Sequence, residues 1–182
     1  NEDILSIIDR HNIENNIIIF GNLPYNISTK ILSSLITLKK WPPWYDVLIL
    51  MFQKEVADRI IAKVNTKNFG RLSIISNWKL DVEKIIDIKP GSFIPKPKIN
   101  SSLLLFKPKT NFIKIKKNEN LEMITRIFFN QKRKKIKKSF SRLFNNPKLI
   151  IEKLDIDENL RPQNLSLETY LKIAKEYESL RN

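Results

Sequence analysis

The sequence predicts an α/β sheet followed by a small, all-helical C-terminal region. Continuous apolar runs of strand length occur at residues 17–20, 47–52 and 103–106. Stretches with apolar residues at helical spacing separate the first runs, whereas only helical spacing is seen after residue 118. Alternation of strands and helices is typical of a doubly wound sheet, and the change of pattern predicts a second domain.

The first predicted unit is a strand, a loop and a helix. Residues 17–20 show no polar alternation, which favours a strand that is covered on both faces. Ser28 is the expected N-cap of a helix whose apolar side chains recur between residues 31 and 36, and Pro42 with Pro43 stops it.

The second half of the predicted sheet repeats this pattern less regularly. Residues 47–52 predict a strand, and the spacing of Val56, Ile60, Ile61 and Val64 predicts the helix after it. A turn at Phe69 and Gly70, a short helix over 72–78 and strands at 85–88 and 103–106 complete the expected first domain. Its limits are set at residues 1–110.

The remaining residues, 111–182, are expected to form a helical domain. The stretch 107–118 is lysine-rich and without periodicity, which is typical of a linker. Beyond it, apolar residues at helical spacing predict helices over 121–128, 136–143 and 167–174.

Composition excludes several classes of protein. There is no cysteine and only one histidine, so neither a disulfide framework nor a zinc site is expected, and no metal is predicted. No stretch approaches the roughly 18 apolar residues of a membrane span, and no signal peptide is visible. We therefore expect a cytoplasmic protein that does not enter a membrane.

The charge predicts a polyanionic partner. The net charge is +14, and residues 126–142 hold eight lysine and arginine side chains without one acidic residue. A compositional bias toward lysine, isoleucine and asparagine is the alternative explanation of the total, but it does not explain the cluster.

The stretch Asn22-Leu23-Pro24-Tyr25 follows the first predicted strand, at the edge where α/β sheets bind ligands. The Asn22 side-chain oxygen and the carbonyl of Pro24 or its neighbour are suited to accept the two N–H bonds of an exocyclic amine. Pro24 stiffens the turn, and Tyr25 offers a ring on which a base can stack. The alternative is a strand-ending turn with Tyr25 in the core.

Four stretches resemble the ribosomal RNA adenine dimethyltransferase family, over nearly the whole chain. They are GNLPYNIST at 21–29, MFQKEVADRI at 51–60, FGRLSI at 69–74 and SFIPKPKINSSL at 92–103. The C-terminal stretches FFNQKRKKIKKSF at 128–140 and RPQNLSLETYLKIAK at 161–175 resemble the branch that dimethylates two adjacent adenines near the 3′ end of small-subunit ribosomal RNA. Large-subunit relatives match these stretches poorly.

The resemblance implies a fold, a cofactor and a set of site residues. The expected fold is the C-terminal part of a Rossmann-like, S-adenosylmethionine-dependent methyltransferase sheet plus the helical domain. Catalytic positions are implied at Asn22, Leu23, Pro24 and Tyr25, with Phe93 on the other face of the base, and cofactor contacts at Asp3, Ile4 and Asn22. Contacts to the RNA are expected from Arg71, Lys96, Lys132, Arg133, Lys134, Lys135, Lys137 and Lys138.

Two departures from the family pattern matter. Asn100 replaces an acidic residue, and none of the three glycines lies in a cofactor-binding loop. The sequence is therefore interpreted as an N-terminally truncated fragment that binds S-adenosylmethionine weakly or not at all.

The expected partner is the small-subunit rRNA or its precursor particle, bound by a monomer. A non-enzymatic assembly factor or mitochondrial transcription factor of the same fold is the main alternative function. A DNA adenine methyltransferase would share the tetrapeptide but not the C-terminal stretches.

Overall fold

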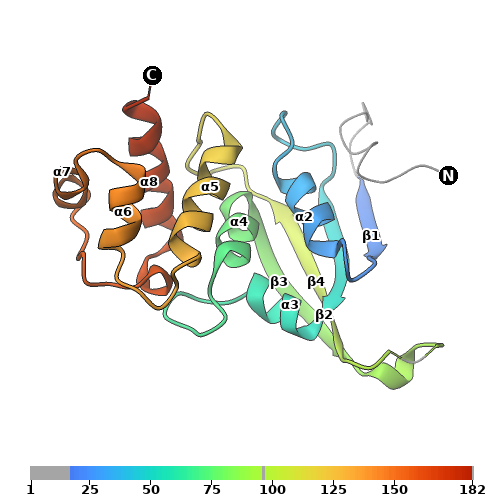
Figure 1. The fold of residues 1–182 in the computed structure, drawn as a ribbon. Helices are drawn as coiled ribbons and strands as arrows, with labels where there is room; N and C mark the ends of the chain where they lie inside the picture. Colours follow the sequence, from blue (N-terminus) through green and yellow to red (C-terminus); the bar gives the residue numbers. More distant parts are fainter. Residues whose placement is uncertain (1–16, 96, 182) are drawn as a thin grey trace. The chain divides into compact units, whose positions relative to one another are not determined.

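The computed structural model describes residues 17–95 and 97–181, and they divide into two compact units. The described part of the first unit comprises residues 17–61, 79–95 and 97–112, and that of the second comprises 62–78 and 113–181. Figure 1 shows the strands in the first unit and most of the helices in the second.

The first unit is built on a mixed sheet in the order β1-β2-β4-β3. Its strands are β1 (Ile18–Asn22), β2 (Val47–Gln53), β3 (Leu80–Ile88) and β4 (Ser101–Pro108). β1 and β2 are parallel, whereas β4 is antiparallel to both β2 and β3. The loop from β3 to β4 contains only the short 3-10 helix η1 (Pro90–Ser92), so no crossover returns the chain and β4 must run antiparallel.

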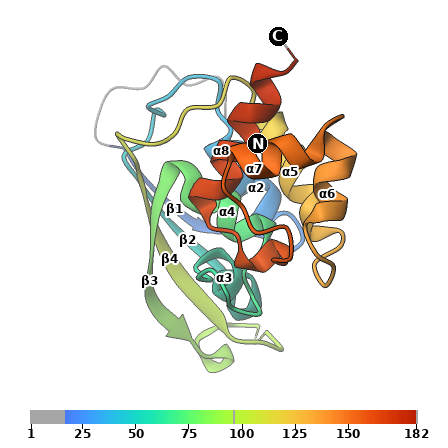
Figure 2. The ribbon, with the colours of Figure 1, turned by 90° about the vertical axis from the view of Figure 1, so that its left-hand side faces the viewer.

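Helices α2 (Ser28–Ile36) and α3 (Lys54–Ile60) lie on one face of this sheet (Figure 2). Alternate residues of β2, namely Leu48, Leu50 and Phe52, are fully buried and share one face of the strand. The expected N-cap at Ser28 is wrong by one residue. Ile27 occupies that position, and the Ser28 hydroxyl instead donates to the Tyr25 carbonyl at 3.2 Å.

The expectation that β1 is covered on both faces is wrong for the described residues. Ile18 and Phe20 are 54% and 73% exposed, and they lie opposite Val47 and Ile49 on the second face of the sheet. β1 pairs with β2 along one edge, and no described strand pairs with its other edge. The apolar run is therefore a strand, as predicted, but one with an open side.

The second unit is helical, as expected for the C-terminal region. It contains η2 (Pro162–Asn164), all but the last residue of α4 (Arg71–Lys79), and the helices α5 (Asn118–Phe129), α6 (Lys137–Leu143), α7 (Pro147–Lys153) and α8 (Leu167–Ser179). Phe128 forms the centre of its core, with edge-to-face contacts to Phe140 and Tyr170 at 5.5 and 5.4 Å between ring centroids.

Residues 62–78 belong to this helical unit, although the sequence placed them in the first domain. Long-range contacts hold them there. Phe69 packs against Phe129 at 6.4 Å, and the Trp78 indole N–H donates to the Ile113 carbonyl at 2.9 Å. The helix α7, which the sequence did not predict, begins at Pro147 with Asn146 as its cap.

Candidate active site

A cavity of about 370 Å³ lies at the carboxyl end of β1. Its lining comes from the turn at residues 22–25, from Met51 of β2, and from four residues of the loop between β3 and β4. The loop residues are Phe93, Ile94, Pro95 and Pro97. Folding therefore places Asn22, Leu23, Pro24, Tyr25 and Phe93 around one cavity, although about 70 residues separate the turn from the loop.

Asn22 is the last residue of β1 and lies opposite Met51 in the sheet. Its side chain is exposed and makes no hydrogen bond to the described residues. The amide oxygen is thus free to accept a proton from a ligand in the cavity.

The Pro24 carbonyl is partly engaged. It accepts a hydrogen bond from the Ile27 N–H at 3.1 Å, which closes the turn between β1 and α2. A carbonyl oxygen has two lone pairs, so a second donor can still bind. The turn therefore keeps one acceptor position at Pro24 while it fixes the direction of the oxygen.

Tyr25 is held by a hydrogen bond to the first residue of β4. Its hydroxyl forms a 2.9 Å hydrogen bond with the hydroxyl of Ser101, which is fully buried at the start of β4. The Tyr25 side chain is half-buried and lines the cavity, as does the half-buried Phe93. Two aromatic rings thus contribute to the walls, one from each of the two segments.

Polar contacts fix both stems of the loop that carries Phe93. The Lys54 backbone N–H donates to the Asn100 carbonyl at 2.9 Å. Asp87 accepts the Ser102 hydroxyl at 2.6 Å and the ammonium groups of Lys54 and Lys84, each at 3.2 Å. The Ser102 hydrogen bond, and after it the two lysines, lower the pKa of Asp87 to about 2. This carboxylate is therefore ionised throughout the neutral range.

Sequence reasoning missed five residues of the site. Met51 could have been found, because it lies near the carboxyl end of the strand next to β1. Ile94, Pro95 and Pro97 are close to Phe93 in sequence. No sequence pattern indicated Ser101, since its role depends on a hydrogen bond between residues 76 positions apart.

The basic residues expected to contact RNA fall into two groups. In the first group, the cationic side chains bind other residues of the second unit. The Lys132 ammonium donates to the carbonyls of Lys67 and Phe69 at 2.5 and 2.9 Å, Lys135 donates to Asn159 at 2.7 Å, and Lys137 pairs with Glu158 at 3.0 Å. Lys132 is half-buried, so its main contacts stabilise the segment before α4.

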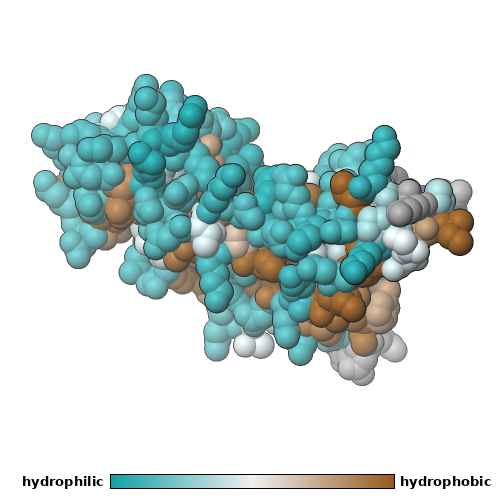
Figure 3. Space-filling model, turned by 90° about the horizontal axis from the view of Figure 1, so that it is seen from below, coloured by the Kyte–Doolittle hydropathy of each residue, from teal (hydrophilic) through white to brown (hydrophobic). Residues whose placement is uncertain are grey.

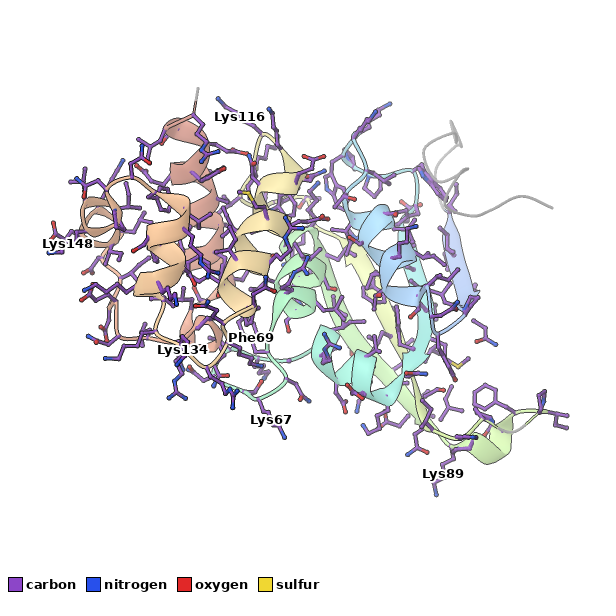
Figure 4. All side chains as sticks on the ribbon, viewed as in Figure 1. Lys67, Phe69, Lys89, Lys116, Lys134 and Lys148 are labelled. Carbon is purple, nitrogen blue, oxygen red and sulfur yellow. The ribbon has the colours of Figure 1, made fainter. Side chains whose placement is uncertain are left out.

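In the second group the charges face solvent. Arg133, Lys134 and Lys138 are exposed, and their side chains form no ion pair or hydrogen bond with the described residues. Arg71 is exposed at the first position of α4. In Figure 4 the side chains of Lys134 and Lys67 extend outward from the second unit, and Lys116 and Lys148 do so at other edges. Asp3, Ile4 and Lys96 lie outside the described residues.

Two further observations limit the chemistry of the described part of the chain. No group of acidic or histidine side chains among those residues is arranged to hold a metal ion. None of the described helices is both long and apolar enough to cross a membrane.

The mixed sheet, with an Asn-Leu-Pro-Tyr turn and an aromatic loop at its carboxyl edge, defines a Rossmann-like methyltransferase. The sequence pattern of the family "Ribosomal RNA adenine dimethylase" matches residues 2–179. The chain belongs to this family.

The curated relatives are named as ribosomal RNA methyltransferases. The "Ribosomal RNA small subunit methyltransferase A" of Pelagibacter ubique (strain HTCC1062) is 59% identical over 181 residues, which cover 100% of this chain and 69% of that protein. The protein of the same name from Afipia carboxidovorans is 36% identical over 156 residues, 86% of this chain and 55% of that protein. The chain thus spans between about half and seven tenths of these relatives.

Solved structures show the same fold. A dimethyladenosine transferase from Plasmodium falciparum superposes with a TM-score of 0.76 at 26% identity, over 94% of this chain and 70% of that one. The 23S rRNA methyltransferase ErmE gives a TM-score of 0.60 at 16% identity, over 97% and 70%. The second likeness concerns the fold alone.

Proposed function

We propose that this chain acts in an rRNA adenine N6-methyltransferase that dimethylates two adjacent adenines near the 3′ end of small-subunit rRNA, with S-adenosylmethionine as methyl donor. The cavity that unites residues 22–25 with Phe93 carries this proposal. Its acceptors and rings have the chemistry that an adenine base needs, and the family supplies the substrate class.

The proposed role of the turn is to hold the amine. An adenine amino nitrogen is a poor nucleophile, because its lone pair is delocalised into the ring. The Asn22 side-chain oxygen and the Pro24 carbonyl oxygen each accept a hydrogen bond from one N–H group of the amine. The lone pair of the amine nitrogen is then directed to one face of the base. The nitrogen sheds its proton to solvent after methylation, so positioning rather than a strong base accounts for the rate.

Tyr25 and Phe93 are proposed to stack on the two faces of an adenine turned out of the RNA. Stacking on an aromatic ring is worth about 1–3 kcal/mol per base, which offsets the cost of unstacking. After the first methyl transfer only one N–H remains, so a single acceptor must hold the amine for the second.

Asn22 also fits the expected cofactor. Of the three residues predicted to contact S-adenosylmethionine it is the one within the described part, and its exposed amide lies at the carboxyl end of two parallel strands. When bound, the cofactor supplies an electrophilic methyl group. An amide at this point can hold the amine beside the donor, which is the arrangement the reaction needs.

The alternative of a non-enzymatic factor is less well supported. A protein that only binds RNA needs no amide with a free hydrogen-bond acceptor at the end of the strand. The curated relatives also carry methyltransferase names. Small-subunit rRNA as the partner and a cytoplasmic location are likewise proposed from the family. The monomeric state stays a prediction, to be tested by size-exclusion chromatography with light scattering.

Replacement of Asn22 tests the proposal. In the full-length protein, Asn22→Ala should lower kcat by about 10²-fold or more, as loss of one aligned polar group does in other active sites. RNA affinity should change little, because the basic surface supplies most of it. The measurements are single-turnover methylation and fluorescence anisotropy with a 3′-terminal rRNA stem-loop.

Asn26→Ala is the matched control. Asn26 is exposed in the same turn but does not line the cavity, so its loss should leave both quantities unchanged. Equal losses of turnover and affinity in Asn22→Ala would contradict the proposed role.

A further inference from the structure

Ile94 is the most exposed large apolar side chain in the described part of the chain, at 102% of its reference area. It lines the mouth of the cavity, next to Phe93, in the loop that projects from the sheet at the lower right of Figure 1. Phe93 has an extended backbone, with φ −126° and ψ 148°. Phe93 is half-buried, whereas its neighbour Ile94 is fully exposed, as expected of successive side chains in an extended segment.

The surroundings of Ile94 indicate a polyanionic partner. Lys89 and Lys98 are exposed on the same loop, and no acidic residue occurs between Asp87 and Glu119. The same cavity offers a free amide and two aromatic rings, as an extruded base requires. An exposed isoleucine beside these groups is better suited to contact nucleic-acid bases than to contact water.

We propose that Ile94 is a wedge that enters the RNA base stack at the place vacated by the extruded adenine. This inference rests on the proposed function and adds a positioning residue to it. Extrusion leaves the neighbouring bases without a stacking partner, and apolar side chains inserted at such steps are a known means of stabilising the gap. The β-branched side chain suits this task, because few rotamers are lost on insertion.

The test uses this chain and an RNA stem-loop without cofactor. The stem-loop carries two adjacent adenines in its loop and the fluorescent base 2-aminopurine beside them. Insertion of Ile94 unstacks the reporter from its neighbour, and isoleucine does not quench it, so wild-type protein should raise the fluorescence. Anisotropy with a terminal dye gives the affinity of the same complex.

Ile94→Ala should lower the affinity about tenfold, from the apolar area no longer buried, and should remove most of the fluorescence rise. Ile94→Leu should retain both the wild-type affinity and the fluorescence rise. Ile99→Ala is the matched control, since Ile99 is 43% exposed on the same loop but does not line the cavity. It should behave as wild type.

Two results would overturn the wedge. One is an Ile94→Ala variant that matches Ile99→Ala in both readouts. The other is a lower thermal midpoint of Ile94→Ala without RNA, which would show that Ile94 packs against its own chain. If wild-type protein binds the stem-loop no better than a hairpin without adjacent adenines, the proposed function fails instead.

Discussion

Two hydrogen bonds determine how the Tyr25 ring is presented to the cavity. Its hydroxyl is bound to Ser101 at 2.9 Å, and its carbonyl accepts the Ser28 hydroxyl at 3.2 Å. The first bond joins the turn after β1 to the start of β4, and the second joins it to α2. The ring is therefore fixed at both ends before any base binds.

Loss of the Ser101 hydroxyl should loosen this ring. In the full-length protein, Ser101→Ala should lower kcat/KM, and it should lower the free energy of unfolding by about 0.5–1.5 kcal/mol, the usual net value of one hydrogen bond. Tyr25→Phe removes the other partner and should cost about the same. Steady-state methylation and urea unfolding measure the two quantities.

The double variant Ser101→Ala with Tyr25→Phe provides the check. If the two hydroxyls act through one bond, it should lose no more than either single variant. Strictly additive losses would show that Ser101 does not act through Tyr25, and Ser101→Thr should recover activity if it does.

Gly21 explains how the turn approaches β2 so closely. A Cβ atom at this position would lie 2.7 Å from Leu50 Cδ2 and 3.0 Å from Leu23 Cδ2. Leu50 is fully buried and has little room to move. A side chain at position 21 would therefore push the turn away from the sheet edge on which the cavity depends.

Among the elements, α8 holds the start of α5 through one carboxylate. Glu178 is buried, and it accepts hydrogen bonds from the backbone N–H groups of Lys116 and Lys117 at 2.9 and 3.0 Å and from the Asn120 amide at 2.8 Å. Burial tends to raise the pKa of Glu178, but these hydrogen bonds outweigh it and lower the pKa below the usual 4.5. An ionised Glu178 thus fixes residues 116–120 against α8.

This lowered pKa makes the helical unit sensitive to acid. The unfolded chain takes up the proton first as the pH falls, so the contribution of Glu178 is complete above about pH 4.5 and is lost as the pH falls through the lower pKa of the folded state. Glu178→Gln should remove this part of the pH dependence. At neutral pH it should cost about 1–3 kcal/mol, because the new amide N–H group would face a backbone N–H donor, of Lys116 or of Lys117, that now binds a carboxylate oxygen.

Urea unfolding between pH 3 and 7 tests this, with Glu176→Gln as the control. Glu176 is the residue two positions earlier on α8, and it pairs with the exposed Lys153 at 2.7 Å. The same acid sensitivity in Glu178→Gln as in wild type would contradict the assignment.

At the scale of the whole molecule, the surfaces of the two units differ in hydropathy in the view of Figure 3. Figure 3 shows hydrophobic residues gathered over the first unit, whereas the visible face of the second is mostly hydrophilic. The first unit leaves Ile18, Phe20 and Ile86 about half exposed or more. The second carries the exposed cations Arg133, Lys134 and Lys138.

Those three cations should dominate the salt dependence of RNA binding. Replacing all three by Gln should reduce the slope of log K against log salt concentration by about 2 to 3, since each phosphate contact releases roughly one counterion. Lys132→Met removes an equal charge per site but should mainly destabilise the helical unit, because Lys132 is bound to the Lys67 and Phe69 carbonyls.

Anisotropy titrations at several salt concentrations, with thermal unfolding of each variant, separate the two effects. A large change of slope in Lys132→Met at unchanged stability would show that its structural contacts yield to phosphate when RNA binds.

The local elements and the chemistry of the turn could be predicted from the sequence alone. Apolar runs and helical spacing depend on nearby residues, so they predicted β1, β2, β4 and most helices to within a few positions. The tetrapeptide at 22–25 predicted acceptors and a ring at a strand end, because both features belong to adjacent residues. The family of the chain was predicted from short motifs of the same kind, and the match to the family model confirms that prediction.

The contacts between residues distant in sequence became known only from the folded structure. It brought Phe93 and Ser101 to the turn, gave β4 its antiparallel direction and placed residues 62–78 with the helices. It also divided one basic run into cations that stabilise their own unit and cations that face solvent. Each of these outcomes depends on contacts between residues far apart in the chain, and such contacts leave no periodic pattern in the sequence.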